Sequence, residues 1–521
     1  MGLHRHLAAN CLVAGARILL ALAPAAAGTV IAFVASPLLA FAQSASSKAV
    51  TGAAQSIRQA WPGKVTTRHT VTIGGKSLTF DATAGYVTLR NSGTRKAIAD
   101  VAFIAFTRVG DDIATRPLTF AFNGGPGYAS AWLNIGALGP WRISMAGKGV
   151  FPSARPELTV NQESWLPFTD MVFIDPAGTG YGRIHGSGAT GSLWSVSGDI
   201  DALATVIRRW VEANGRTKSP KFLAGESYGG FRVPLVTHEL QTDQGIGING
   251  QILISPVLDF ARRRHRSAMS YVAALPSIAA TAMSAKAGAK GASHSDLASV
   301  ESYARGRFLT DLVRGRSDAS AVKRLNEKIV ALTGLDQAFV ARRAGRISTS
   351  VFAREYYRKS GRVAAIYDGL VTGLDPDRHA SRNQSEDQMR LGLHAPIIQA
   401  MVGLYREKLK WVYPDGRYQF QNKRAGRNWK WGRRPPESVS ELASTLALDP
   451  NMRILVVHGL TDLATPYFET RLVLDDMPMI TGGNRITFKV YMGGHMFYSR
   501  AKSRQSFRDD AQKLIGMAKS N

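Results

Sequence analysis

The chain has 521 residues, a formal net charge of +27 and a single cysteine, Cys11. One cysteine excludes an intrachain disulfide framework and a cysteine metal cluster, and no His-Glu-x-x-His motif occurs, so we expect no metal and no cofactor. A chain of this length can bury enough apolar surface to fold without such supports.

The N-terminus has the pattern of an export signal. Basic residues precede an apolar run over 18–42 that has no acidic residue, and residues 40–42 form an A-x-A cleavage site. We predict a cleaved signal peptide over 1–42, rather than an uncleaved anchor, and a flexible Ser/Ala-rich tether over 43–60. Because the mature chain would have no thiol, it fits a bacterial periplasmic or secreted protein. No later segment approaches membrane-span length, so we expect no stable membrane insertion after cleavage.

The next two hundred residues have the pattern of a sheet protein. Alternating β-branched and polar residues over 64–108 predict antiparallel hairpins. Apolar strands then alternate with helical segments, as they do in βαβ units. We expect these strands at 118–122, 171–175, 221–225 and 251–255, with a helix at 199–213.

A possible nucleophile lies where the third of these strands ends. Residues 222–230, FLAGESYGG, contain the one G-x-S-x-G in the sequence, centred on Ser227. This pattern builds a nucleophile elbow, a sharp turn between a strand and a helix that exposes the serine oxygen. A glycine-rich loop, NGGPG at 123–127, follows the strand at 118–122, and its backbone N–H groups can face a developing oxyanion. We predict Ser227 as the nucleophile and the N–H groups of Gly125 and Tyr228 as the oxyanion hole.

The C-terminal part supplies an acid and a base in the order that α/β-hydrolases use, which is Ser, then Asp or Glu, then His. An apolar strand leads through a turn to Asp462, and a second strand leads to His495. A serine needs a base to take its proton and an acid to orient that base, and we predict these roles for His495 and Asp462. Asp175 and Asp259 remain alternative acids, whereas His458 lies within the first of these strands and is more readily structural.

The predicted fold class is α/β, an α/β-hydrolase with a central, mostly parallel sheet. Residues 261–444 lack strand alternation and have a mainly helical pattern. Because the candidate catalytic residues lie on both sides of this segment, one domain must contain both ends. We therefore expect a core built from 61–260 and 445–521, interrupted by a largely helical cap insertion over 261–444.

Taken together, these motifs resemble the serine carboxypeptidases, peptidase family S10. The resemblance runs from Thr70 to the C-terminus, is weakest between 262 and 440, and extends to segments 173–181 and 254–259. It implies a serine-type carboxypeptidase that releases C-terminal residues from peptides through an acyl-enzyme. An esterase or acyltransferase on the same triad is the alternative, because a fold does not fix a substrate.

The resemblance also implies that Asn123, Gly124 and Glu226 bind the terminal carboxylate of the substrate. A carboxylate can accept a hydrogen bond from a second carboxyl group only if that group is protonated, so Glu226 needs a raised pKa. The network is nevertheless thinner than in many members of the family. Three positions depart from the usual pattern: Ala121 for Trp, Tyr128 for Cys and Ala137 for Glu.

The positive charge is concentrated in the predicted insertion. Residues 261–444 contain 33 Lys+Arg and 16 Asp+Glu, a net charge of +17, and segment 423–434 interleaves basic residues with Trp429 and Trp431. Three interpretations stay open: a solvated basic face, an electrostatic funnel for anionic peptide C-termini, or a basic envelope or nucleic-acid binding protein with a vestigial site. The complete set of catalytic candidates argues against the last, so we expect no nucleic-acid partner.

Overall fold

The computed structural model describes residues 62–145, 151–263, 267–288, 291–380, 387–413, 416–478 and 485–517. The predicted signal peptide over 1–42 and tether over 43–60 lie outside the described residues. All structural statements below concern the described part of the chain.

The fold begins with three long antiparallel strands, β1 (Val65–Ile73), β2 (Lys76–Arg90) and β3 (Ala97–Arg108). The β1–β2 turn is formed by Gly74 and Gly75, both at positive φ, a conformation that glycine adopts without steric cost. The hairpins predicted over 64–108 are therefore confirmed.

Six parallel strands continue the sheet, and they occur at the predicted places to within about one residue, which is the usual scatter of strand boundaries. The sheet order is β1-β2-β3-β7-β4-β9-β10-β13-β14, with β8 beside β3. The parallel strands are β4 (Leu118–Phe122), β7 (Asp170–Ile174), β9 (Lys221–Glu226), β10 (Gly250–Ile254), β13 (Arg453–Gly459) and β14 (Ile486–Tyr491). Every residue of β4, β7, β9 and β10 is buried, as expected for strands that helices cover on both faces.

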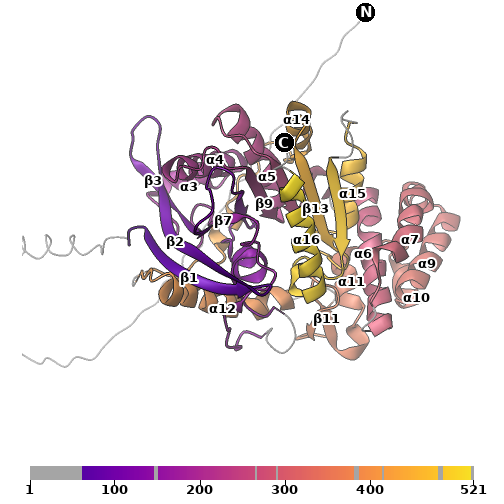
Figure 1. The fold of residues 1–521 in the computed structure, drawn as a ribbon. Coiled ribbons are helices and arrows are strands. Elements are labelled where there is room, and N and C mark those ends of the chain that lie inside the picture. The colour runs from indigo at the N-terminus through magenta and orange to yellow at the C-terminus, as the bar shows by residue number, and fades with distance from the viewer. Residues whose placement is uncertain are drawn as a thin grey trace, which may run out of the picture. The chain divides into compact units, whose positions relative to one another are not determined.

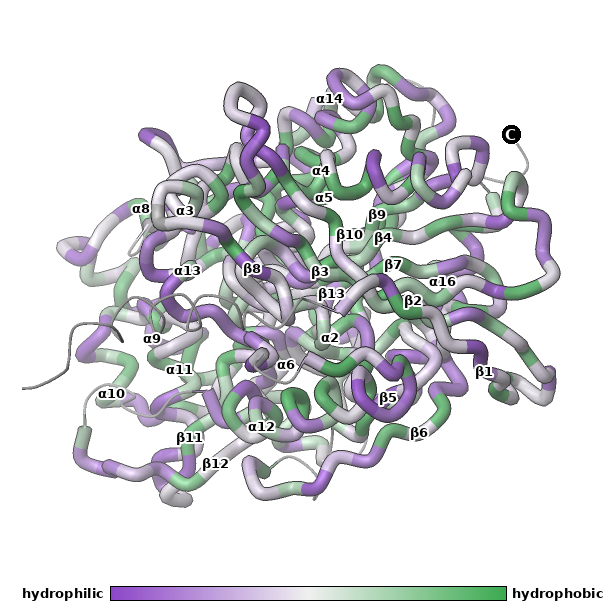
Figure 2. Tube along the Cα trace, turned by 90° about the vertical axis from the view of Figure 1, so that its left-hand side faces the viewer, coloured by the Kyte–Doolittle hydropathy of each residue, from purple (hydrophilic) through white to green (hydrophobic). Residues whose placement is uncertain are grey.

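Successive residues of these strands face two separate hydrophobic clusters. Phe120 and Leu223 pack with α4 (Val196–Ala213), α5 (Tyr228–Thr242) and α14 (Val439–Leu448) on one side of the sheet. Ala121 and Phe222 pack with α2 (Ala131–Leu133) and α16 (Ala501–Met517) on the other. In Figure 2 the central strands are drawn largely green and lie among these helices. The central, mostly parallel sheet of an α/β-hydrolase is therefore present.

The segment predicted as a cap is mainly helical, and much of it gathers beside β14, on the side away from β1–β3 (Figure 1). Its helices are α6 (Ala268–Ala287), α7 (Ala298–Tyr303), α8 (Leu309–Val313), α9 (Ala319–Thr333), α10 (Gln337–Arg342), α11 (Thr349–Glu355), α12 (Gln388–Gly403) and α13 (Lys423–Arg427). It also contains a small hairpin, β11 (Arg362–Ala364) with β12 (Thr372–Leu374). Helix α14 extends beyond residue 444 and its apolar residues pack in the core cluster with α5, so this end of the segment joins the hydrolase core.

Helix α6 corrects one expectation from the sequence. It is 20 residues long with a mean hydropathy of 1.3 over its most apolar window, which is long and apolar enough to cross a membrane. However, 67% of that window is buried, and the helix packs among the other helices of the insertion. Its apolar character is therefore explained by packing inside the protein.

Short elements complete the fold around this framework. They are β5 (Trp141–Arg142), β6 (Thr159–Val160), β8 (Arg183–Ile184), α3 (Ser187–Leu193) and α15 (Tyr467–Asp475). Among them, α15 follows the loop after β13 and packs against α6, which connects the hydrolase core with the insertion.

Candidate active site

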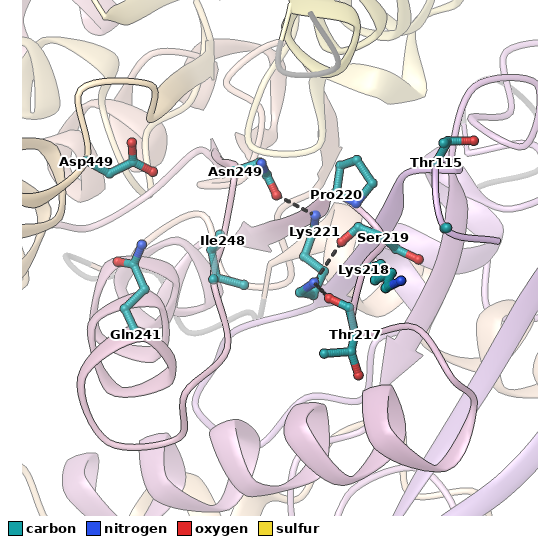
Figure 3. Close-up of a pocket in the computed structure, with 12 residues that line it drawn as sticks. Thr115, Thr217, Lys218, Ser219, Pro220, Lys221, Gln241, Ile248, Asn249 and Asp449 are labelled. Atoms are coloured by element: carbon teal, nitrogen blue, oxygen red, sulfur yellow. Dashed lines mark hydrogen bonds between the residues drawn. The ribbon is translucent and has the colours of Figure 1, made fainter. Parts of the chain in front are cut away.

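Two hollows lie at opposite ends of the parallel strands. At the amino ends, a hollow of about 540 Å³ is lined by Lys218 and Lys221 (Figure 3). The Lys221 ammonium already donates to the Thr217 and Ser219 carbonyls at 2.7 Å, so its hydrogen bonds are made within the protein. At the carboxyl ends, a cavity of only about 20 Å³ is lined by Ser227 and His495. The smaller cavity is the candidate active site, because ligands of open α/β sheets bind at the carboxyl ends of the strands.

Ser227 occupies a sharp turn between β9 and α5. Its φ of 61° and ψ of −121° are strained for a residue with a side chain, at a cost of about 1–3 kcal/mol. Both neighbouring glycines are required by this turn. A Cβ on Gly225 would collide with the Gly229 carbonyl oxygen, and one on Gly229 would lie 2.5 Å from the Phe122 carbonyl oxygen. The Ser227 N–H donates to the Ile254 carbonyl at 2.9 Å, which ties the elbow to β10.

His495 and Asp462 form a buried pair. The His495 Nδ1 lies 2.8 Å from Asp462 Oδ2, so Nδ1 carries the proton and Nε2 is the basic nitrogen of the neutral ring. Burial lowers the pKa of His495, but the Asp462 carboxylate outweighs it, and the net shift is upward. The other Asp462 oxygen accepts the N–H groups of Ala464 and Thr465 at 2.8 and 2.9 Å, which fixes the carboxylate after β13.

The alternative residues occupy other environments. Asp175 accepts the Ser130 N–H at 2.7 Å, and its burial raises its pKa to about 7. Asp259 accepts the Ala261 N–H at 2.7 Å and pairs with Arg262. His458 is buried, and its pKa is lowered to about 3 by burial, so it stays neutral. Within the described residues, Asp462 is the carboxylate paired with His495.

The NGGPG loop lies against the elbow. A Cβ on Gly124 would lie 2.5 Å from the Tyr228 nitrogen, so only glycine allows this close approach. The Asn123 carbonyl accepts from Arg232, whose Nε donates to Asp199 at 2.6 Å in a fully buried ion pair. Arg232 therefore holds the NGGPG loop in position through the Asn123 carbonyl. The sequence patterns do not indicate this role.

Glu226 and Asn123 line the same cavity as Ser227. Burial raises the pKa of Glu226 to about 7, although His495, Tyr498 and Asn123 partly oppose this rise. The Tyr498 hydroxyl donates to Glu226 Oε2. The Asn123 amide nitrogen is buried without a hydrogen bond of ordinary geometry to any described residue, although its side chain is close enough to moderate the pKa of Glu226. A polar donor and a readily protonated carboxyl group thus lie next to the serine.

Several residues in or around the site were not predicted from the sequence, among them Thr465, Tyr498, Tyr367 and Arg390. The Thr465 hydroxyl lies 2.7 Å from Asp462 Oδ2 and 3.0 Å from His495 Nδ1. Tyr367 comes from the insertion; its ring lies edge-on to His495 at 4.8 Å and its carbonyl accepts the His495 N–H. Of these residues, only Thr465 could have been suspected from the sequence, since it lies within the turn that contains Asp462.

Both tryptophans of segment 423–434 contact Tyr228, although Trp431 remains partly exposed. The rings of Trp429 and Trp431 each lie edge-on to Tyr228, with centroids 5.6 Å apart, and Trp429 is buried. Tyr228 also stacks on Phe231 of α5. These tryptophans therefore help to hold the residue after Ser227 in place.

Comparison with solved structures agrees with the fold described above. The prohormone-processing carboxypeptidase Kex1(Δ)p from Saccharomyces cerevisiae has a similar structure, with a TM-score of 0.54 at 14% identity, covering 84% of this chain and 91% of that one. At this identity the likeness concerns the fold alone. Fold and sheet topology together define an α/β-hydrolase.

The sequence comparison goes further. The family model described as "Serine carboxypeptidase" matches residues 73–490, and the chain belongs to that family. "Serine carboxypeptidase-like 25" of Arabidopsis thaliana is 29% identical over 172 residues, 32% of this chain and 33% of that protein. The "Pheromone-processing carboxypeptidase KEX1" of Yarrowia lipolytica is 29% identical over 156 residues, 30% of this chain and 24% of that protein. These alignments span a third or less of each curated relative.

Proposed function

We propose that the protein is a serine carboxypeptidase that releases C-terminal residues from peptides with a free C-terminus. The observation that carries this proposal is the pairing of two features in one cavity. Ser227 and His495 can perform acyl transfer, and Glu226 with Asn123 can hold a carboxylate beside them. A general esterase needs the first pair and has no use for the second.

In the proposed reaction, the Ser227 Oγ attacks the scissile carbonyl carbon while His495 Nε2 takes its proton. Asp462 holds the imidazole in the required tautomer and stabilises its protonated form. The N–H groups of Gly125 and Tyr228 stabilise the oxyanion. Collapse of the tetrahedral intermediate transfers the proton to the departing amine and leaves an acyl-enzyme. Water, deprotonated by His495, then releases the acyl part and restores Ser227.

Recognition of the terminal carboxylate is assigned to Asn123, Gly124 and Glu226. The Asn123 amide and the Gly124 N–H are neutral donors, whereas Glu226 can donate only when it is protonated. Its pKa of about 7 allows this at neutral and acidic pH. Ala137 stands where many relatives have a second carboxyl group, and the Tyr498 hydroxyl is the group bonded to Glu226 in this chain.

We also infer that the enzyme is exported by a bacterium and works in the periplasm or outside the cell. The support is the composition of residues 1–42 and the absence of cysteine after Cys11. The chemistry described above needs no metal or cofactor, and we expect peptides to be the partners.

The test compares two blocked dipeptides that differ only at the C-terminus, benzyloxycarbonyl-Phe-Ala and its amide. A carboxypeptidase of this kind cleaves the free acid with a much higher kcat/KM than the amide at pH 6. Equal kcat/KM values for the two peptides would contradict carboxypeptidase function while leaving a serine hydrolase.

A further inference from the structure

One segment of the insertion, 366–369 in the hairpin loop between β11 and β12, lies against the loops that carry two triad residues. The Tyr367 carbonyl accepts the His495 N–H at 2.5 Å. The preceding carbonyl of the same loop accepts the N–H of Leu463, the residue after Asp462, at 3.0 Å. The insertion is therefore hydrogen-bonded to the backbone beside both members of the acid–base pair.

The contact is close enough to require glycine in the loop after β14. A Cβ on Gly494 would lie 2.1 Å from the Tyr367 carbonyl oxygen and 2.4 Å from the Asp368 Cβ. A side chain at this position would push the two loops apart. On the side of β13, the Gly369 N–H donates to the Thr461 carbonyl at 3.0 Å. The hairpin loop thus fits tightly against both core loops.

Asp368 joins the two core loops through its side chain. The carboxylate is only 2% exposed. Its Oδ1 accepts the hydroxyl of Thr461, which immediately precedes Asp462, at 2.7 Å. Its Oδ2 accepts Nη2 of Arg500, which lies shortly after His495, at 2.9 Å. One buried carboxylate from the insertion is therefore bonded to the loop of the acid and to the loop of the base.

We propose that Asp368 is a positioning residue that sets the geometry of the His495–Asp462 pair. The proposal rests on the triad of the proposed function and is independent of how the terminal carboxylate of a peptide is bound. Asp368 acts through Thr461 and Arg500, because these two residues belong to the loops that must keep a fixed spacing. Acyl transfer is sensitive to displacements of about 1 Å, so such a link supports kcat more than substrate binding. Part of the insertion then belongs to the catalytic framework of the enzyme.

The link has a consequence for the pKa of His495. Burial lowers this pKa, the Asp462 carboxylate raises it, and the net shift is upward. Glu226 also raises it, whereas Arg263 lowers it. If the two loops separate, the effect of Asp462 weakens and the pKa of His495 falls. The kcat/KM for an ester, which requires neutral His495, should then rise with pH at a lower midpoint than in wild type.

The experiment measures kcat, KM and the pH dependence of kcat/KM on p-nitrophenyl acetate, an ester without a free carboxylate. Asp368→Asn keeps the size of the side chain, but its single carbonyl oxygen cannot accept from both Thr461 and Arg500. We expect kcat to fall by about 10–100-fold with little change in KM, and the midpoint to move to lower pH. Thr461→Val changes no charge, so a shift of its midpoint can come only from geometry; its kcat should fall by about 3–10-fold, and Thr461→Ser should restore most of it.

The matched control is Asp375→Asn. Asp375 is also a carboxylate of the insertion, with a side chain that is 3% exposed and paired with Arg354. Its partners, the Arg354 guanidinium and the Asp377 N–H, belong to the insertion. This variant should therefore leave kcat and the midpoint unchanged.

The outcomes are distinguishable. A wild type that neither reacts with a fluorophosphonate nor hydrolyses the ester would remove the triad, and with it both the proposed function and the role of Asp368. An active wild type whose Asp368→Asn and Thr461→Val variants keep its kcat and midpoint would overturn only the role of Asp368. Equal losses in Asp368→Asn and Asp375→Asn would overturn it as well, because loosening of the insertion would explain both. If circular dichroism shows that Asp368→Asn does not fold, Thr461→Val and its rescue by Thr461→Ser decide.

Discussion

The two halves of the candidate site are built on different parts of the molecule. Ser227, Asp462 and His495 each follow a parallel strand of the hydrolase sheet, and each is fixed by backbone hydrogen bonds close to the strand end. The half proposed to bind the carboxylate contains Asn123, Gly124 and Glu226, and its cavity is also lined by Tyr367 and Arg390 from segment 261–444. The first half keeps the family motifs. Of the three departures from the family pattern, Tyr128 lines the cavity of the second half, whereas Ala121 and Ala137 are buried in the core.

This difference has a physical reason. Acyl transfer requires the serine, the base and the acid in one geometry, and small displacements are costly to the rate. A carboxylate, in contrast, can be held by amide, hydroxyl, protonated carboxyl or guanidinium donors in several combinations. Recognition can therefore be rebuilt by substitutions around the cavity while the catalytic half stays unchanged.

The largest effect is expected in the catalytic half. Ser227→Ala and His495→Ala should each lower kcat by about 10⁴–10⁶-fold with little change in KM, because both remove a group that acts in the transition state. Fluorophosphonate labelling followed by mass spectrometry checks the same assignment, with one modified site expected at Ser227. Continued labelling of the Ser227→Ala protein would contradict the nucleophile, and His458→Ala tests whether the effect is specific to His495.

The next effect belongs to the carboxylate-binding half and depends on pH. Glu226 can donate to the substrate carboxylate only below its pKa of about 7. Above it, ionised Glu226 repels the substrate, so kcat/KM for free acids should fall about tenfold per pH unit. Amide or ester substrates lack this requirement, and their rate should rise with pH until His495 is neutral.

Two variants sharpen that pH comparison. Glu226→Gln keeps a donor without a titration and should remove the alkaline fall for free acids while sparing esters. Tyr498→Phe removes a hydrogen bond that lowers the pKa of Glu226, so the fall should move to higher pH. Identical pH profiles for acid and ester in wild type would exclude Glu226 from carboxylate binding.

The catalytic half could be predicted from the sequence more completely than the half proposed to bind the carboxylate. The elbow glycines, the strand before Asp462 and the NGGPG loop are local patterns, and the sheet that joins them follows from strand alternation. Tyr367 and Arg390 have no such pattern, because they reach the cavity only through the way in which segment 261–444 packs against the core. The same limit applies to Trp429 and Trp431: interleaved with basic residues they are compatible with nucleic-acid binding, and only their contacts with Tyr228 show packing.

A smaller effect on kcat is expected for Thr465, which positions the triad without belonging to it. Thr465→Val removes the hydroxyl that bonds Asp462 and should lower kcat by about tenfold, the scale of one buried hydrogen bond. Thr465→Ser should restore most of the activity. The control is Thr470→Val, which removes a different buried hydroxyl, one that lies on α15 and donates to the Pro256 carbonyl. This variant should leave kcat unchanged. Equal effects of the Thr465 and Thr470 variants would indicate a general loss of packing.

The smallest effect concerns the long-range charge of the insertion. If its excess of +17 attracts anionic substrates, raising the salt from 0.05 to 1 M should lower kcat/KM for acidic peptides several-fold, because the screening length shortens from above about 10 Å to about 3 Å. The value of kcat should hardly change, since steering acts on the encounter. Contacts inside the cavity are less screened, so the preference for free acid over amide should persist at 1 M salt. An equal salt response for neutral amides and acidic peptides would leave the insertion with a solvated basic face and confine recognition to the cavity.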